Sequence, residues 1–181
     1  MWPSSILLAL LLAGLATARA AAPAVRFDAQ SARSGKWSDA RTWGDKRAPR
    51  AGDNVRIRPG HVVTYDANSE DTVRVVHVAG TLTFARDKST RLNVGLLKVA
   101  PGEECSEDGF NCHEMAEPAD AEPRGEKSLP EPPALEIGTP VNPIPPNVTA
   151  TIRLTYFEGT DTNSLPALIS CGGRMDTMAR R

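Results

Sequence analysis

The sequence has little of what marks several large classes of protein. Aromatic residues make up only 5% of its 181 residues, and 21 lysines and arginines are balanced by 22 aspartates and glutamates, giving a formal net charge of -1. Without an excess of basic residues there is no electrostatic basis for binding a phosphate backbone, so nucleic acid is not expected as a partner. The 14 glycines and 15 prolines interrupt the chain every few residues, which disfavours a helical bundle.

No apolar run is long enough to cross a membrane. The longest, residues 6–16, falls short of the ~20 residues that a spanning helix needs, and Ala18-Arg19-Ala20 follows it as a small-x-small cleavage pattern. We therefore predict a signal peptide over residues 1–20, although no Lys or Arg precedes the run. The mature protein is expected to have no transmembrane segment and to be secreted, or to lie in the periplasm or on the cell surface of a bacterium.

Cysteine is scarce, with three residues at 105, 112 and 171. Cys105 and Cys112 flank a turn signal, and in an exported chain such a short loop favours a disulfide, which would contribute ~2 kcal/mol. The alternative is a pair of metal ligands, but a zinc site needs further Cys or His at a suitable spacing and only His113 is close. We predict the disulfide and no metal or cofactor. Cys171 is either a buried thiol or half of a pair whose partner lies beyond the chain.

The strongest positive signal is a series of short β-type runs. Each is four to nine residues long, rich in Val, Ile, Thr and Leu, and bounded by Gly, Pro, Asn or Asp. No segment keeps a 3.6-residue apolar period for three turns, and only residues 38–42 could form a short helical turn. An all-β domain is predicted, with strands at 54–58, 61–65, 72–78, 81–84, 92–99, 135–138, 149–157 and 167–171.

Residues 103–134 interrupt this pattern with an acidic, proline-rich segment. Such a composition cannot bury enough apolar surface to offset its ordering entropy, so we predict a long insertion loop. Its acidic residues lack the Asp-x-Asp-x-Asp-Gly spacing of a calcium loop. Beyond the insertion, Asn147-Val148-Thr149 is a glycosylation acceptor triplet in a host that glycosylates exported chains.

Two arrangements of the strands are open. The strands could wind as a β-roll or β-helix-like module, in which each coil stacks on the last, or they could form an antiparallel β-sandwich. We favour the roll because Val75, Leu82 and Val94 could stack as inward β-branched and aliphatic residues. The chain also lacks an Asn-Gly type of two-residue hairpin turn between strands.

Several ordered motifs resemble the eight-glycine extracellular module, called the G-eight domain. They are GKWSDARTWG at 35–44, PRAGDNV at 49–55, PGHVVTYD at 59–66, VAGTLTF at 78–84, YFEG at 156–159 and GGRMD at 172–176. The resemblance covers residues 34–176, which we take as the module, with a linker at 21–33 and a tail at 177–181. It implies an all-β module, as found in fibrocystin-like receptors and in cell-surface proteins that bind and depolymerise hyaluronan. In larger members a right-handed parallel β-helix follows, and this sequence has no such segment.

The sequence presents no catalytic constellation. Glycoside hydrolysis normally uses two carboxylates facing each other across a cleft. The aspartates that could serve sit at turns or near the chain end, where capping of the backbone is the simpler interpretation, and the histidines have no ligand spacing. The aspartates are Asp39, Asp53, Asp66, Asp71 and Asp176, and the histidines are His61, His77 and His113.

The predicted ligand-binding residues are Trp37, Trp43, Arg41 and Asp66. Aromatic faces stack on sugar rings, although two tryptophans this close together could equally close one end of a small core. Our leading hypothesis is a secreted, non-catalytic module that binds an extracellular ligand, a glycan or a surface protein. Two alternatives are the front part of a hyaluronidase-like, polysaccharide-degrading β-helix enzyme, and a structural cap or truncated fragment.

Overall fold

The computed structural model describes residues 25–103, 105 and 131–180. The predicted signal peptide and most of the predicted insertion loop lie outside these residues. The described chain is almost entirely β, with one 3-10 turn, η1 (Ala40–Thr42), where the short helical turn was predicted. The all-β prediction is confirmed.

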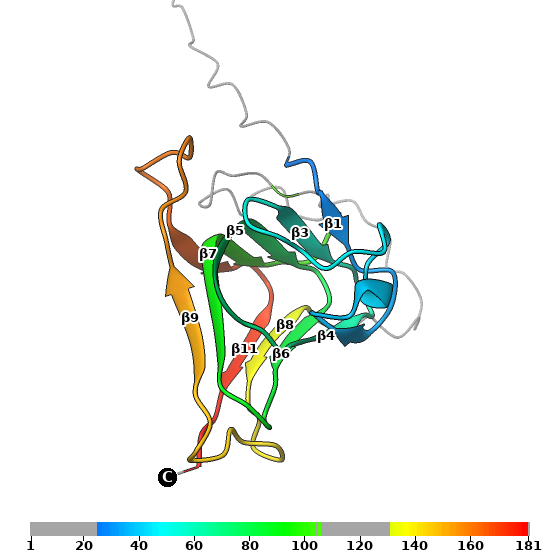
Figure 1. Ribbon diagram of the computed structural model, residues 1–181, viewed down its shortest axis with the longest axis vertical. Helices are drawn as coiled ribbons and strands as arrows, with labels where there is room; N and C mark the ends of the chain where they lie inside the picture. Colours follow the sequence, from blue (N-terminus) through cyan, green and yellow to red (C-terminus); the bar gives the residue numbers. More distant parts are fainter. Residues whose placement is uncertain (1–24, 104, 106–130, 181) are drawn as a thin grey trace, which may run out of the picture.

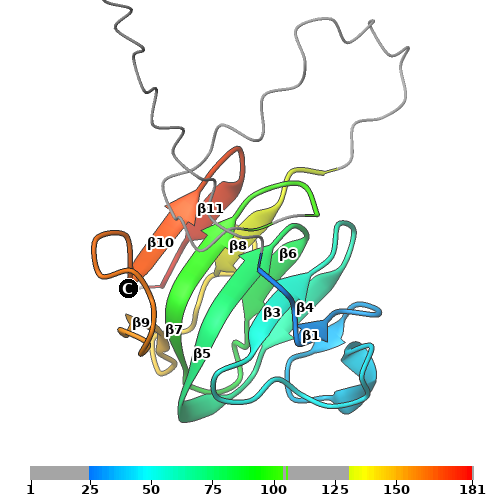
Figure 2. The same ribbon diagram turned by 90° about the horizontal axis from the view of Figure 1, so that it is seen from above.

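The strands form two sheets. The first sheet has the order β1-β3-β5-β7-β10, with β9 also paired to β7, and the second has the order β11-β8-β6-β4-β2. Figure 1 shows the two layers, and Figure 2 looks onto β3, β5 and β7 side by side. The strands of the first sheet are β1 (Ala29–Gln30), β3 (Asn54–Ile57), β5 (Asn68–Val78), β7 (Thr90–Val99), β9 (Ala150–Leu154) and β10 (Ala167–Ser170). Those of the second are β2 (Gly35–Lys36), β4 (Val62–Tyr65), β6 (Thr81–Phe84), β8 (Ala134–Ile137) and β11 (Arg174–Thr177).

From β1 to β8, successive strands alternate between the two sheets, and each pairs in parallel with the strand two positions earlier. At the far end, β9 and β10 both lie along β7, and β11 pairs with β8, again in parallel. Parallel neighbours need a crossover between them, and the strand of the opposite sheet supplies it. We call one pass of the chain through both sheets a rung.

The core lies between the sheets and is built from residues at matching positions of successive rungs. Val55, Val76 and Leu97 are in register on the first sheet. Val63 and Leu82 are in register on the second. All five are 0% exposed. Inward Val and Leu side chains therefore stack from rung to rung, as the period-two alternation of the sequence predicts.

The first rung is closed by aromatic residues. Trp37 and Trp43 are 4% and 1% exposed, and their rings meet edge to face with centroids 5.1 Å apart. The indole Nε1 of Trp43 donates to the carbonyl of Trp37 at 2.8 Å, and Trp37 also contacts Tyr65, with ring centroids 5.1 Å apart. The preceding Asp39 caps η1 by accepting from the Arg41 N–H at 2.9 Å.

The first sheet is also buried on its outer face, which alternation alone does not predict. The prediction that Val75 stacks inward with Leu82 and Val94 is wrong. Val75 and Leu96 are 0% exposed on this outer face and pack with Leu165, Cys105 and the N-terminal segment that carries Phe27. Strands β5 and β7 consequently have two buried faces and act as central strands of the domain.

A row of basic residues lies on the same outer face. Arg56, His77 and Lys98 are in register on β3, β5 and β7, and they are 6%, 0% and 4% exposed. Phe27 covers this row, since its ring stacks on His77 at 5.8 Å and lies 5.9 Å from the Arg56 guanidinium. The Nε2–H of His77 donates to the carbonyl of Ala100 at 3.1 Å. Burial lowers the pKa of His77 to about 4, so this side chain is neutral in the folded protein at pH 7.

The turn between β5 and β6 requires glycine. A Cβ at Gly80 would lie 2.3 Å from the Arg58 carbonyl oxygen and 2.5 Å from that of His61, both in the turn of the preceding rung. The Gly80→Ala variant should therefore lose about 1–3 kcal/mol of unfolding free energy, the range for overpacking. Urea denaturation followed by circular dichroism measures this. Gly44→Ala is the control, because its nearest contact is 3.6 Å away, and an equal loss in both variants would contradict the prediction.

Candidate functional site

The outer face of the second sheet carries a row of polar side chains, one from each rung. Lys36, Thr64, Thr83, Glu136 and Asp176 occupy matching positions on β2, β4, β6, β8 and β11. Neighbouring strands are about 4.8 Å apart, so the row offers a hydrogen-bonding group at each such step. We call these five residues the polar ladder.

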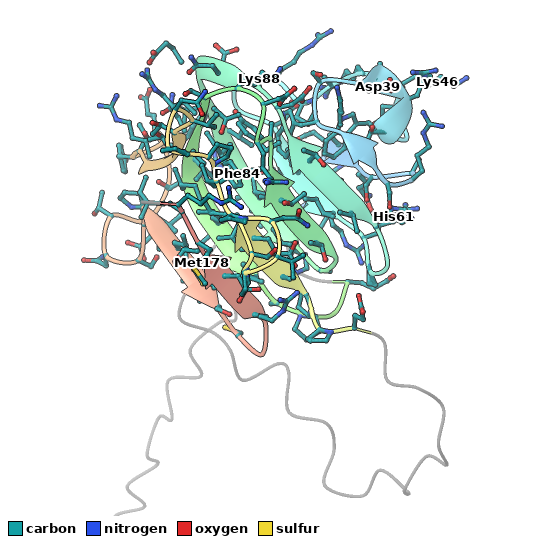
Figure 3. The ribbon with its side chains drawn as sticks, turned by 90° about the horizontal axis from the view of Figure 1, so that it is seen from below. Asp39, Lys46, His61, Phe84, Lys88 and Met178 are labelled. Atoms are coloured by element: carbon teal, nitrogen blue, oxygen red, sulfur yellow. The ribbon has the colours of Figure 1, made fainter. Side chains whose placement is uncertain are left out.

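A groove of about 430 Å³ lies over four of the five residues of the polar ladder, all except Asp176. Its walls come from the turn after β6, which carries Lys88, and from the segment after β8. Figure 3 views the molecule from below, with Phe84 and Lys88 labelled. The lining residues are Lys36, Thr64, Asp66, Thr83, Phe84, Ala85, Arg86, Asp87, Lys88, Glu136, Gly138, Thr139 and Asn142.

Asp66 is the most firmly held charged group of the groove. Its side chain is 6% exposed, and its two carboxylate oxygens accept from the Ser38 N–H at 3.0 Å and the Ser38 hydroxyl at 2.7 Å. The ammonium of Lys88 lies 3.8 Å from the same carboxylate. Asp66 therefore ties the chain around Ser38 to the strand end after β4 and fixes one wall.

Two further charged groups are held by partners. Arg86 donates through Nε to the Pro143 carbonyl at 3.0 Å and through a terminal nitrogen to the Asn142 side chain at 3.1 Å. Glu136 of the polar ladder pairs with Arg174 at 2.7 Å. These contacts hold the walls of the groove in place, and a preformed site is usual for ligand binding.

Two of the carboxylates that line the groove already have partners. Asp66 accepts from Ser38 and lies beside Lys88, and Glu136 pairs with Arg174. Within the ranges described, no three His, Cys, Asp or Glu side chains gather closely enough to hold a metal ion.

The structure separates the four residues predicted to bind a ligand. Asp66 lines the groove, whereas Arg41 lies on η1, is exposed, and pairs with Asp39 at 3.0 Å. Trp37 and Trp43 are buried in the core, so a sugar cannot reach their ring faces. Neither residue is part of the candidate site.

Sequence reasoning missed the threonines of the polar ladder. Thr64 and Thr83 were assigned to strands, where threonine is an ordinary residue. Their alternation with buried Val63, Leu82 and Phe84 is the signal that places them outward. Only the strand register sets them side by side.

Other candidate aspartates and histidines have structural partners. Asp53 pairs with Arg47 and accepts from the Arg50 N–H at 2.9 Å. The hydroxyl of buried Ser31 lies 2.8 Å from Nδ1 of His61. These contacts hold loops together. Asp176 pairs with Arg174 on β11.

The predicted disulfide falls partly outside the described residues. Cys105 is 2% exposed, and its carbonyl accepts from the Val25 N–H at 2.7 Å. Cys112 lies outside the described residues. Cys171, however, is disulfide-bonded, and because the chain has three cysteines, a bond from Cys171 to either of the other two excludes the predicted Cys105–Cys112 pair. Asn147 of the glycosylation triplet is exposed.

One of three comparisons with known proteins and families gives a match. The family model of the G8 domain matches residues 42–175, which lie within the segment that resembles the G-eight module. No curated protein and no solved structure matches. In the part of the chain that is described, no helix is both long and apolar enough to span a membrane.

Proposed function

Because this chain belongs to the G8 domain family, a family of extracellular domains, we propose that it is a non-catalytic module that binds an extracellular glycan. The ligand lies in the groove over the polar ladder. Export through the predicted signal peptide is part of the same proposal.

One observation carries the proposal: the groove repeats hydrogen-bonding side chains at the strand spacing. Thr64 and Thr83 present hydroxyl groups that both donate and accept, with Lys36 as a donor at one end and Glu136 as an acceptor at the other. A linear polymer with hydroxyl groups along its length matches a row of this kind.

We also propose that the strands form a β-roll. The alternation of β1 to β8 between two parallel sheets supports it, because each rung then returns the chain to the position of the previous strand. In a roll the outer face of each sheet repeats from rung to rung. A groove on such a face can bind a linear polymer along its length.

Removal of the threonine hydroxyls tests the site. Thr64→Val and Thr83→Val keep the side-chain shape and should each weaken glycan binding about 3- to 10-fold, since one hydrogen bond contributes ~1 kcal/mol. Calorimetric titration with the best ligand from a polysaccharide panel that includes hyaluronan measures the loss, and thermal unfolding verifies the fold.

Thr81→Val is the matched control, because Thr81 lies two residues before Thr83 on the same strand but does not line the groove. An equal effect of Thr81→Val, or a folded protein that binds no glycan of the panel, would refute the proposal.

A further inference from the structure

The two ends of the stack of rungs differ. At the first end β1 and β2 have two residues each, and Trp37 and Trp43 cover the core. At the other end β9, β10 and β11 are edge strands. Figure 3 shows Asp39 and Lys46 of the first end far from Met178 of the second. We call the surface formed by β9, β10, β11 and Met178 the open end.

Inward-facing side chains are exposed at the open end. Met175 continues the row of Val63, Leu82 and Leu135, which are at most 1% exposed, yet Met175 itself is 41% exposed. Leu154 likewise follows buried Val94 and is 41% exposed. Met178 is 43% exposed. The last layer of the core is thus uncovered among the residues described.

A hollow of about 360 Å³ lies between the edges of the two sheets. Apolar side chains and short polar ones line it, namely Ile137, Ile144, Val148, Thr149, Ala150, Thr177, Met178 and Ala179. An exposed apolar surface beside unpaired strand edges is a site for association.

The backbone of β11 is arranged to pair on its outer side. Arg174 N–H donates to the Pro133 carbonyl and Met178 N–H to the Ile137 carbonyl, both at 2.8 Å. In a parallel ladder the residues between such donors direct their N–H and C=O groups to the opposite side. The backbone groups of Met175 and Thr177 therefore face the open edge.

The charges on β11 fit a second copy of the same strand. Arg174 and Asp176 flank Met175. If two copies of β11 pair antiparallel with Met175 opposite Met175, each Arg174 lies opposite the other copy's Asp176. Centring the pair on Asp176 would instead bring like charges together, which destabilises a cross-strand pair.

We propose that the open end docks a second copy of this chain through antiparallel pairing of β11, giving a two-fold symmetric dimer. The same surface is used on both copies, so the contact closes on itself. Head-to-tail stacking would need the first end as the partner, and Trp37, Trp43 and η1 already cover that end. The inference does not depend on the proposed glycan groove.

Charge reversal and its rescue test the dimer on the full secreted chain. Sedimentation velocity up to about 1 mM protein should show a monomer–dimer equilibrium. Arg174→Asp or Asp176→Arg alone places like charges opposite each other and should raise the dimer dissociation constant at least ~10-fold. The double variant Arg174→Asp/Asp176→Arg restores opposite pairs and should recover most of the affinity.

Lys46→Asp, at the covered end, is the matched control and should leave the dissociation constant unchanged. Circular dichroism verifies that each variant is folded, since Arg174 also pairs with Glu136. A monomer at every concentration, open-ended polymers, single variants without effect, or a folded double variant that fails to dimerise would each overturn the proposal.

Discussion

The Trp43→Ala variant should lose about 3–5 kcal/mol of unfolding free energy, the range for removing a large buried aromatic side chain. Trp43 is 1% exposed, and its ring packs edge to face on Trp37. The substitution also removes the hydrogen bond to the Trp37 carbonyl and leaves a cavity at the end of the core. A loss of this size is a large part of the total stability of a small domain.

Chemical denaturation followed by circular dichroism measures the loss. Arg41→Ala is the control, because this exposed residue lies on the same turn and its replacement should change stability by no more than about 0.5 kcal/mol. If Trp43→Ala instead kept its stability and lost glycan binding, the tryptophans would form a binding platform and our assignment of both to the core would be wrong.

Stability should also fall as the pH is lowered from about 6.5 to about 4, through His77. The pKa of His77 is lowered to about 4, mainly by burial and to a smaller extent by the positive charges of Arg56 and Lys98, while the hydrogen bond to Ala100 opposes the shift. The unfolded chain, with an ordinary histidine pKa near 6.5, binds a proton in this window and the folded chain does not. The unfolded state is therefore favoured on acidification, by about 3 kcal/mol at pH 4 and below, and this loss is absent above pH 6.5.

The His77→Gln variant isolates this contribution. Glutamine keeps an N–H that can donate to the Ala100 carbonyl but does not titrate, so the variant should lose less stability than the parent between pH 6.5 and 4. Urea midpoints at half-unit pH steps give both curves. Parallel curves for His77→Gln and the parent would show that His77 does not carry the effect.

The groove shows where prediction from the sequence ends. Asp66 was predicted to bind a ligand and lies in the groove. Thr83 and Glu136, by contrast, are 53 positions apart but are direct partners on β6 and β8. No sequence feature near Thr83 or Glu136 predicts that the two residues are in register.

Trp37 and Trp43 show a second feature that the sequence alone could not decide. Their proximity in the sequence allowed two interpretations, a sugar-stacking surface or the closing of a core. Which interpretation holds depends on whether another part of the fold covers the two rings. In the structure η1, Tyr65 and the first rung cover them.

The amino-acid sequence alone determined the β class, the positions of β3 to β10 and the G8 resemblance, because alternation of apolar residues and turn signals are local properties, but it did not predict β1, β2 or β11. Within the short strands it also determined which side chains share a face, but not along β5, where Val73 packs in the core and Val75 on the outer face. Tertiary structure decided which face is inner, which strands are neighbours, and which end of the stack stays uncovered. Those features depend on pairings between distant segments, and the burial of β5 and β7 on both faces follows from what packs on them rather than from their own pattern.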